Sequence, residues 1–314
     1  MKTKVNKTKT KNYYTKNIQK PFLKWVGGKT QLLEKILKKI PNSIENYFEL
    51  FLGGGSVLLA VLSLQKQGKI AIKNKIYAYD VNENLINVYK NVKNNKDKLY
   101  SIIETYKNEY NKCPPGEKGK NNRKPENLEQ AKTSKESYYY WLRKKFNSMN
   151  KNTIEYSALF IVLNKLCFRG VYREGPNGFN VPYGHPKKTP EIITQEKLNN
   201  ISDLIQNVTF NALGFQKSIK NINNGDFVYL DPPYAPENTN SFVGYVKDGF
   251  NLDMHKLLFK EIKNFDNIKF LLSNSKVKLV TDNFKEYTIE DVRARRAINS
   301  KNPGATTTEV LIYN

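Results

Sequence analysis

The nine residues 226–234, which read DFVYLDPPY, constrain the fold of this chain more than any other stretch. Their first half contains the apolar run Phe227–Leu230, which is typical of a buried strand. Asp231 and Tyr234 then flank two prolines, which cannot donate to a β-ladder and therefore end the strand in a rigid turn. Because ligands bind at the carboxyl ends of strands in an open α/β sheet, this turn predicts recognition of a flat nitrogen heterocycle.

A second feature is a glycine turn between a predicted strand and a predicted buried helix. Gly53 and Gly55 let the backbone approach a ligand closely and leave room for the helix to pack on the strand. Leu58 occupies the third glycine position of the dinucleotide fingerprint, so a nucleoside without phosphates fits better than a pyrophosphate. The next predicted strand ends at Asp80, which is placed to hold ribose hydroxyls; alternatively, Asp80 caps a helix that begins near Asn84.

A glycine pair and a lysine precede the first predicted helix. Gly27, Gly28 and Lys29 stand just before an amphipathic pattern that Pro41 ends. Backbone N–H groups and a cation at a positive helix end suit a carboxylate or a phosphate. The alternative is an ordinary helix start with a lysine that extends towards solvent.

A β-hairpin is predicted between Phe168 and Gly184, where turn residues at 175–178 separate two aromatic-rich arms. An arginine can bond a guanine through two hydrogen bonds, and an aromatic side chain can enter a base step. A projecting hairpin of this composition therefore indicates DNA recognition, and an ordinary surface hairpin is the alternative. Further along, residues 235–250 are predicted to form a mobile loop and residues 293–301 a basic loop.

The balance of charge indicates an acidic partner. The 314 residues carry a formal net charge of +23, which favours nucleic acid, with an anionic membrane surface as the alternative. Residues 1–20 contain lysines but no acidic residue, which predicts a flexible basic arm. Residues 113–136 are rich in Pro, Gly, Lys, Asn and Glu, which predicts an exposed loop or a disordered insert.

The cysteines and the apolar runs bear on cofactors and location. Cys113 and Cys167 have neither a metal-site spacing nor a disulfide framework, so no metal is expected and a reduced, cytoplasmic setting fits. The lysine-rich start lacks the apolar segment of a secretory signal, and no apolar run approaches membrane-spanning length. The protein is therefore expected to be soluble, with no membrane partner.

Taken in order, these motifs resemble the Dam-type DNA adenine-N6 methyltransferases, including GATC-modifying enzymes of restriction systems. The resemblance runs from Pro21 almost to Asn314. Its anchors are Phe22–Lys29 (FLKWVGGK), Phe51–Gly55 (FLGGG), Tyr79-Asp80 with Asn84–Tyr89, Asp231–Tyr234 (DPPY) and Leu272–Asn274 (LSN).

The resemblance implies an α/β fold with a doubly wound, mostly parallel methyltransferase-type sheet and a smaller DNA-recognition domain that carries the hairpin. Residues 21–112 and 210–314 would form the catalytic domain, and residues 113–209 the insert and recognition domain. S-adenosylmethionine would be the methyl donor, without a metal, and double-stranded DNA the partner. A cognate restriction endonuclease could act on the same site without stable contact.

The resemblance also carries site residues onto this chain. Lys29 would face the carboxylate end of the donor, and Asp80 its ribose. Phe168 corresponds to the aromatic residue that enters the duplex, and Arg173 to the arginine that reads the guanine of GATC. Arg169 stands where family members often carry asparagine. The implied donor-binding residues are Trp25, Lys29, Phe51, Gly53, Gly55, Asp80 and Asp231. The implied DNA-binding residues are Phe168, Arg169, Gly170, Arg173, Asn180, Arg295 and Arg296.

The turn at 231–234 suggests how an amino group could be methylated. Adenine N6 is a poor nucleophile because its lone pair is delocalised into the ring. The Asp231 carboxylate and the Pro232 carbonyl could accept hydrogen bonds from its two N–H groups, while Tyr234 stacks on a base turned out of the duplex. The implied catalytic residues are Asp231, Pro232, Pro233 and Tyr234.

Other functions remain open at this point. Methylation of cytosine N4 uses the same acceptors, because that amine is also exocyclic and conjugated. An RNA methyltransferase and a non-catalytic DNA-binding protein are further alternatives, although the latter would have no reason to carry Gly53, Asp80 and Asp231 together. Methylation of cytosine carbon 5 is disfavoured, because neither cysteine follows a proline.

Overall fold

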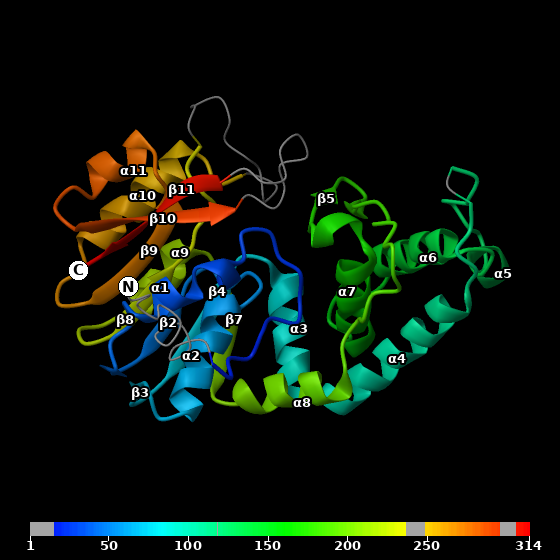
Figure 1. Ribbon diagram of the computed structural model, residues 1–314, viewed down its shortest axis with the longest axis horizontal. Helices are drawn as coiled ribbons and strands as arrows, with labels where there is room; N and C mark the ends of the chain where they lie inside the picture. The colour runs from blue at the N-terminus through cyan, green and yellow to red at the C-terminus, as the bar shows by residue number, and fades with distance from the viewer. Residues whose placement is uncertain (1–15, 118, 237–248, 296–305) are drawn as a thin grey trace, which may run out of the picture.

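The computed structural model describes residues 16–117, 119–236, 249–295 and 306–314 (Figure 1). Seven strands of the described residues form one sheet in the order β10-β11-β9-β8-β2-β4-β7. Neighbouring strands from β9 to β7 are parallel, while β11 runs antiparallel to both of its neighbours. The strands are β2 (Tyr47–Glu49), β4 (Ile76–Asp80), β7 (Val208–Ala212), β8 (Phe227–Leu230), β9 (Lys269–Ser275), β10 (Thr288–Arg295) and β11 (Thr306–Tyr313).

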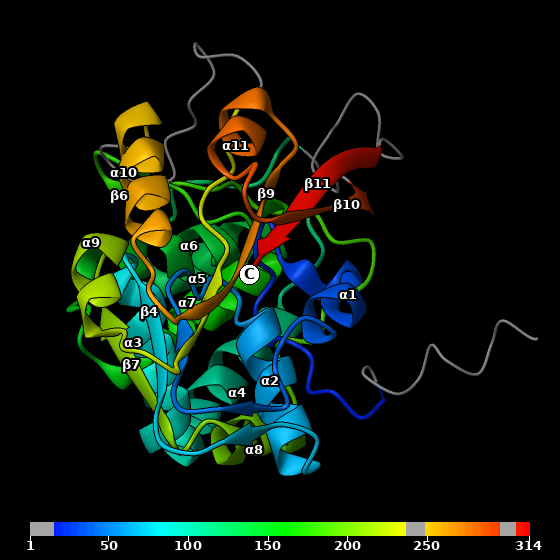
Figure 2. The ribbon, with the colours of Figure 1, turned by 90° about the vertical axis from the view of Figure 1, so that its left-hand side faces the viewer.

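Both faces of this sheet are buried, which explains the uninterrupted apolar run of β8. Tyr229 belongs to one cluster of buried side chains and Leu230 to another, because successive residues of a strand point to opposite faces. Figure 2 shows α10 and α11 well apart from α2 and α8. Helices around the sheet are α1 (Leu33–Leu37), α2 (Ser56–Lys66), α3 (Glu83–Asn94), α8 (Gln195–Leu204), α9 (Phe215–Ser218), α10 (Leu252–Lys263) and α11 (Lys278–Asn283). The predicted α/β fold with a mostly parallel sheet is confirmed.

A helical region lies beside the sheet, in green in Figure 1. It consists of α4 (Lys96–Lys112), α5 (Leu128–Ala131), α6 (Lys135–Ser148) and α7 (Ile154–Leu166). α7 packs against α3 as well as against α4, and one cluster of buried side chains extends from Tyr47 in the sheet to Leu159 in α7. The recognition domain expected from the sequence, residues 113–209, includes α8, but α8 packs against α2 and α3 as well as against α4. The sheet strand β7 begins at Val208, just before the expected domain boundary between residues 209 and 210.

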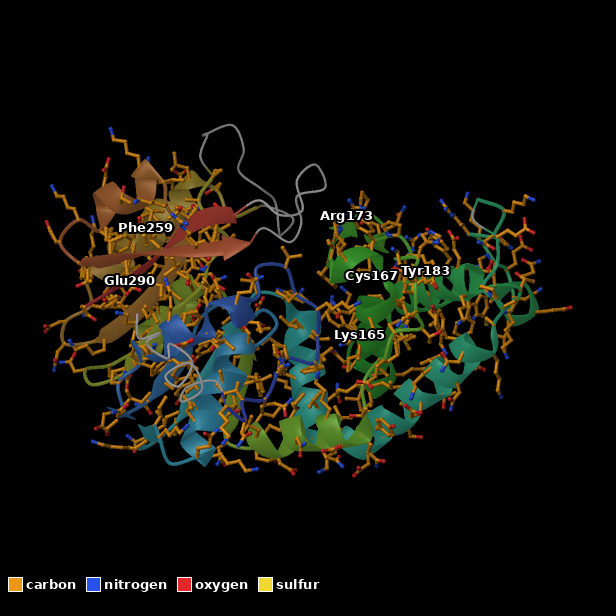
Figure 3. The ribbon with its side chains drawn as sticks, viewed as in Figure 1. Lys165, Cys167, Arg173, Tyr183, Phe259 and Glu290 are labelled. Carbon is orange, nitrogen blue, oxygen red and sulfur yellow. The ribbon has the colours of Figure 1, made fainter. Side chains whose placement is uncertain are left out.

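The predicted hairpin follows α7. Its strands β5 (Glu174–Gly175) and β6 (Gly178–Phe179) pair antiparallel. A bridge between Cys167 and Tyr183 closes its base, and Figure 3 shows these two residues side by side. The turn Phe168–Gly170 (η2) lies between α7 and the hairpin.

Local boundaries differ from the sequence prediction in three places. The helix predicted to begin near Asn84 begins at Glu83 and ends at Asn94, because Asn95 has a non-helical φ of −137° and separates α3 from α4. The first predicted helix is short, with η1 (Lys29–Gln31) before α1. Residues 293–295 continue β10 instead of beginning a loop.

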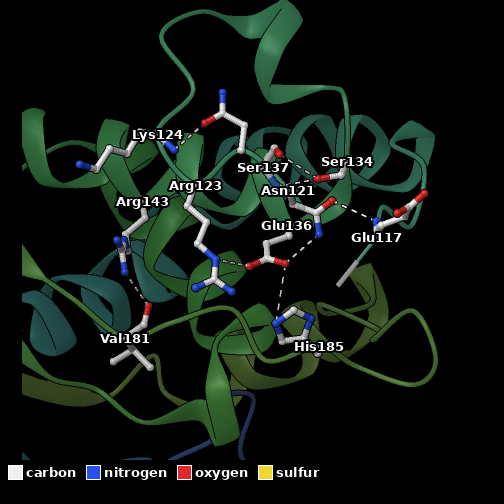
Figure 4. A network of polar contacts seen from close by, with 11 residues as sticks. Glu117, Asn121, Arg123, Lys124, Ser134, Glu136, Ser137, Arg143, Val181 and His185 are labelled. Atoms are coloured by element: carbon white, nitrogen blue, oxygen red, sulfur yellow. Dashed lines mark hydrogen bonds and ion pairs between the residues drawn. The ribbon is translucent and has the colours of Figure 1, made fainter. Parts of the chain in front are cut away.

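Residues 113–136 are more ordered where the structure describes them than the predicted loop. α5 lies there, capped by the side chain of Asn127, and Ala131 is fully buried. Glu136 is 1% exposed and accepts hydrogen bonds from Nε of Arg123 at 2.7 Å and Nδ2 of Asn121 at 2.9 Å (Figure 4). The order was hard to predict from the low apolar content, because a buried carboxylate contributes to it in addition to a few apolar side chains.

Several predicted segments lie partly or wholly outside the described residues. These are the arm at 1–20, of which residues 16–20 are described, the loop at 235–250 and the basic loop at 293–301. In the part of the chain that the structure covers, no helix combines the length and apolar character that crossing a membrane requires.

The Arg123–Glu136 pair gives a prediction about stability. Arg123→Met should lower the free energy of unfolding by about 1–3 kcal/mol, because it leaves a buried carboxylate without its cation. Lys120→Met breaks the exposed Lys120–Glu117 pair and serves as a control that should have no measurable effect. Urea unfolding measures both variants, and equal stability of Arg123→Met and the wild type would contradict the anchoring role.

Candidate active site

The centre of the sheet is a topological switch point. From β2, the chain places β4 and β7 on one side and β8 and β9 on the other. Ligands of open α/β sheets bind at the carboxyl ends of the strands where this reversal occurs. Glu49 ends β2, Asp80 ends β4 and Asp231 follows β8, so their carboxylates are carried to this edge.

Lys29, which is buried, and Asp231, which is partly buried, form an ion pair at this edge. Nζ of Lys29 lies 2.7 Å from Oδ2 of Asp231 and donates to the carbonyl oxygen of Gly27 at 2.5 Å. Burial raises the pKa of Asp231 to about 6, while the neighbouring ammonium of Lys29 opposes the rise. A residue predicted to bind the donor is thus in direct contact with a residue predicted to be catalytic.

Tyr234 is held by a hydrogen bond from its hydroxyl and by a cation near its ring. Its hydroxyl donates to Oε2 of Glu309 at 2.7 Å, and Nζ of Lys29 lies 4.9 Å from the ring centroid. Oδ1 of the buried Asn274 accepts from the backbone N–H of Ala235 at 3.1 Å and so holds the chain just after the ring. Sequence reasoning missed Glu309, because only the pairing of β11 with β9 brings it near Tyr234.

The glycine turn is shaped by two aromatic residues. Gly53 and Gly55 have φ angles of +48° and +65°, which other residues rarely adopt. A Cβ on Gly53 would lie 2.9 Å from Cδ1 of Trp25, and one on Gly55 would lie 2.4 Å from the hydroxyl oxygen of Tyr89 in α3. The absence of side chains at these two positions therefore leaves room for the two aromatic side chains. Phe51 contacts the rings of Phe215 and Phe250 at centroid distances of 6.1 and 6.0 Å.

The carboxylate of Asp80 is hydrogen-bonded to the backbone of the glycine turn. Its Oδ2 accepts from the backbone N–H of Gly53 at 2.9 Å, and its Oδ1 accepts from that of Asn82 at 2.9 Å. Burial raises the pKa of Asp80, and these backbone bonds oppose the rise. The alternative that Asp80 caps the next helix is wrong, because Asn82 is the N-cap and accepts from the N–H of Leu85.

Glu49 is a site residue to which the sequence reasoning gave no role. It is 2% exposed, and the hydroxyl of Tyr47 donates to its Oε2 at 2.7 Å. Burial raises the pKa of Glu49 to about 8, with Asp231 adding to the rise. An acidic residue inside an apolar strand was the signal that could have identified it.

The residues predicted to contact DNA lie together on η2 and the hairpin. Phe168 is 46% exposed, which is unusual for a ring of its size, and the guanidinium of Arg169 lies 5.2 Å from its centroid. Arg169 has a φ of +55°, a conformation that asparagine adopts more readily than arginine. Nε of Arg173 donates to Oδ1 of Asn180 at 2.6 Å, and Figure 3 shows Arg173 at the upper end of the helical region.

The other predicted DNA contacts are placed only in part. Gly170 has a φ of +66°, and a Cβ there would lie 2.2 Å from Cβ of Lys24. The backbone of Arg295 ends β10 opposite Thr306, and Arg296 lies outside the described residues. The basic-loop prediction is thus corrected for Arg295, which lies in a strand.

Lys24, which the sequence reasoning passed over, joins the hairpin region to the segment that carries Trp25. Asn164 in α7 accepts from the backbone N–H of Lys24 and donates to its carbonyl oxygen, both at 2.8 Å. Lys165 lies alongside: burial lowers its pKa to about 8, and the charges of Lys197 and Lys24 add to the effect. Figure 3 labels Lys165 on the side of the helical region that faces the sheet.

Within the described ranges, no group of three or more His, Cys, Asp and Glu side chains is arranged to hold a metal ion. The site therefore offers carboxylates, one buried ammonium and aromatic rings as its chemical groups.

Known proteins similar to this chain agree with these features. A family model described as D12 class N6 adenine-specific DNA methyltransferase matches residues 25–298. The type II methyltransferase M.MjaIII of Methanocaldococcus jannaschii is 36% identical over 295 residues, which cover 90% of this chain and 93% of that protein. The type II methyltransferase M1.LlaDCHI of Lactococcus lactis subsp. cremoris is 31% identical, covering 94% and 95%. A DNA adenine methylase of Haemophilus influenzae is 30% identical, covering 90% and 89%. The chain therefore belongs to the D12 class of N6 adenine-specific DNA methyltransferases.

Proposed function

We propose that this enzyme moves a methyl group from S-adenosylmethionine to N6 of an adenine in GATC, after that base has turned out of the double helix. Membership of the family supports the N6 chemistry and a DNA substrate. The observation that carries the finer proposal is the partly buried carboxylate of Asp231, paired with Lys29, near the ring of Tyr234 at the switch point. The relatives named type II methyltransferases support a role alongside a restriction endonuclease that needs no stable contact with this chain.

The residues at the sheet edge fit the proposed donor, which supplies an electrophilic methyl group on its sulfonium when bound. The hydroxyl of Tyr89 and Oδ1 of Asn84 are buried without a hydrogen-bond partner among the described residues, so this edge has polar groups left to satisfy. Asp80 has lone pairs that could accept ribose hydroxyls in addition to its two backbone bonds. The proposed donor site is completed by Trp25, Lys29, Phe51, Gly53, Gly55 and Asp231.

Asp231 and Pro232 would then activate the amino group. Each accepts one N6–H bond, Asp231 through its carboxylate and Pro232 through its carbonyl, which draws the lone pair back onto nitrogen. The charge of Asp231 also stabilises the positive charge that develops on N6 during transfer. Lys29 occupies Oδ2 and favours the ionised form, and the carboxylate retains further acceptor positions for the amine.

Turning the adenine out of the stack costs a few kcal/mol, and a preorganised stacking contact would offset part of this cost. Tyr234 would stack on the base, a contact worth about 1–3 kcal/mol. Glu309 holds the hydroxyl of Tyr234, so the ring is already oriented before the base arrives. Pro233 keeps the turn rigid, because its φ angle is fixed.

The hairpin would read the site and fill the gap that the adenine leaves. The exposed ring of Phe168 is suited to enter the base stack, with the cation of Arg169 close to the phosphates. Arg173 would bond the guanine through its planar fork, and Asn180 orients that fork. Gly170, Arg295 and Arg296 complete the proposed DNA contacts.

Replacing Asp231 tests the chemistry. Asp231→Ala should lower kcat/KM more than tenfold, because the charged acceptor is lost. The assay combines protein, S-adenosylmethionine and a plasmid, followed by digestion with endonucleases sensitive to GATC methylation and by analysis of the methylated nucleosides. Asp253→Ala, which removes an exposed carboxylate in α10, should leave activity unchanged. Survival of Asp231→Ala activity within tenfold would remove Asp231 from this role.

The raised pKa of Asp231 predicts a pH dependence. The acceptor must be ionised, so kcat/KM should be level well above pH 6 and should fall about tenfold per pH unit well below the pKa of about 6. Initial rates between pH 5 and 8 measure this, with circular dichroism at each pH to verify that the protein stays folded. A flat profile across this range would count against ionisation of Asp231 as a requirement.

Substitutions of Arg173 test the reading of the guanine. Arg173→Ala should cost about 1–3 kcal/mol of discrimination between GATC duplexes and duplexes in which that guanine is replaced. Arg173→Lys keeps the charge but not the planar fork, so it should lose similar discrimination while retaining more of the overall DNA affinity. Both are measured as ratios of kcat/KM on the two duplexes. Selectivity equal to that of the wild type would exclude Arg173 as the reader.

A further inference from the structure

We propose that Tyr172 is a positioning residue that couples the donor pocket to the hairpin, so that the methyl donor and DNA each tighten binding of the other. This inference rests on the proposed function, because it takes Trp25 and Asp80 as part of the donor pocket and Arg173 as the guanine reader. Tyr172 immediately precedes Arg173 in the chain, and its side chain contacts structure on the pocket side in two independent ways.

The first contact runs through Trp25. The rings of Tyr172 and Trp25 are stacked, with centroids 5.9 Å apart and planes 21° from parallel. Trp25 also lies close to the glycine turn, because a Cβ on Gly53 or Gly54 would lie 2.9 or 2.8 Å from it. A ligand that orders the glycine turn would therefore restrict Trp25 and, through the stacked rings, Tyr172.

The second contact runs through Asn84, which lies in the first turn of α3 shortly after Asp80. Nδ2 of Asn84 donates to the hydroxyl of Tyr172 at 2.8 Å and to Oε1 of Glu174 at 3.2 Å. The hydroxyl of Tyr172 in turn donates to the same carboxylate oxygen at 2.6 Å. Glu174 begins β5, so these bonds bracket Arg173 between two anchored neighbours.

These bonds can persist throughout the pH range in which the enzyme works. Burial raises the pKa of Tyr172, and the carboxylate of Glu174 raises it further, so the hydroxyl remains a donor. Asn84 is 5% exposed, so water does not readily replace its partners. The ring of Phe160 in α7 stacks on those of Tyr172 and Trp25, with centroid distances of 5.2 and 6.4 Å, and so helps to hold both rings in place.

Coupling of this kind is reciprocal. If donor binding favours the arrangement that presents Arg173, then DNA binding must favour donor binding by the same factor. The factor is measured with S-adenosylhomocysteine, which cannot transfer a methyl group. The DNA dissociation constant of a GATC duplex is determined with and without saturating S-adenosylhomocysteine, and that of S-adenosylhomocysteine with and without the duplex.

The wild type should show a coupling factor of about fivefold or more in both directions. Tyr172→Phe keeps the stacked ring but removes the hydroxyl, and should reduce the factor at least twofold; Tyr172→Ala should bring it close to one. Tyr138→Phe is the matched control, since it removes a tyrosine–glutamate hydrogen bond to Glu109, between α6 and α4. It should keep the wild-type factor.

Failure of this inference can be told apart from failure of the proposed function. A wild type that binds both ligands without coupling, an unchanged factor in both Tyr172 variants, or an equal reduction in Tyr138→Phe would overturn the coupling role alone. A wild type that neither binds S-adenosylhomocysteine nor methylates GATC would overturn the proposed function and the inference with it.

Discussion

The ion pair between Lys29 and Asp231 holds two distant parts of the chain at one point. Lys29 begins the first helical turn and Asp231 follows a central strand, yet their charged atoms are 2.7 Å apart, with Lys29 buried and Asp231 partly buried. Removing one partner of a buried ion pair typically lowers the free energy of unfolding by ~3–5 kcal/mol, because the other charge stays buried without a counter-charge. The pair thus keeps an anionic acceptor at the site despite the burial that raises its pKa.

The double-sided sheet makes this burial possible. β2 lies between β4 and β8, so Glu49, Asp80 and Asp231 emerge at one edge with apolar clusters on both faces of the sheet. Each carboxylate is held by a different partner: a tyrosine hydroxyl for Glu49, backbone N–H groups for Asp80 and an ammonium for Asp231. The pKa of Glu49, raised by burial to about 8, also leaves this group largely uncharged near neutral pH, which limits the repulsion at this edge.

Much of the fold could be predicted from local patterns. The strand at 227–230 and its proline turn were predictable because an apolar run and proline stereochemistry act within a few residues. The hairpin was likewise predictable from its turn glycines, and its strands at 174–175 and 178–179 were found. The order in residues 113–136 could not be predicted, because it depends on Glu136 meeting Arg123 and Asn121 in a buried site.

By itself, the sequence determined the central strands with their turns, the family and most of the residues that could carry the chemistry. Only the tertiary structure decided which of those residues meet. It brought together three pairs from segments far apart in the chain: the ion pair of Lys29 with Asp231, the hydrogen bond of Tyr234 to Glu309, and the stacked rings of Tyr172 and Trp25. The reason is physical: periodicity and turn stereochemistry act over a few residues, whereas the partner of a buried charge or ring is set by how whole strands and helices pack.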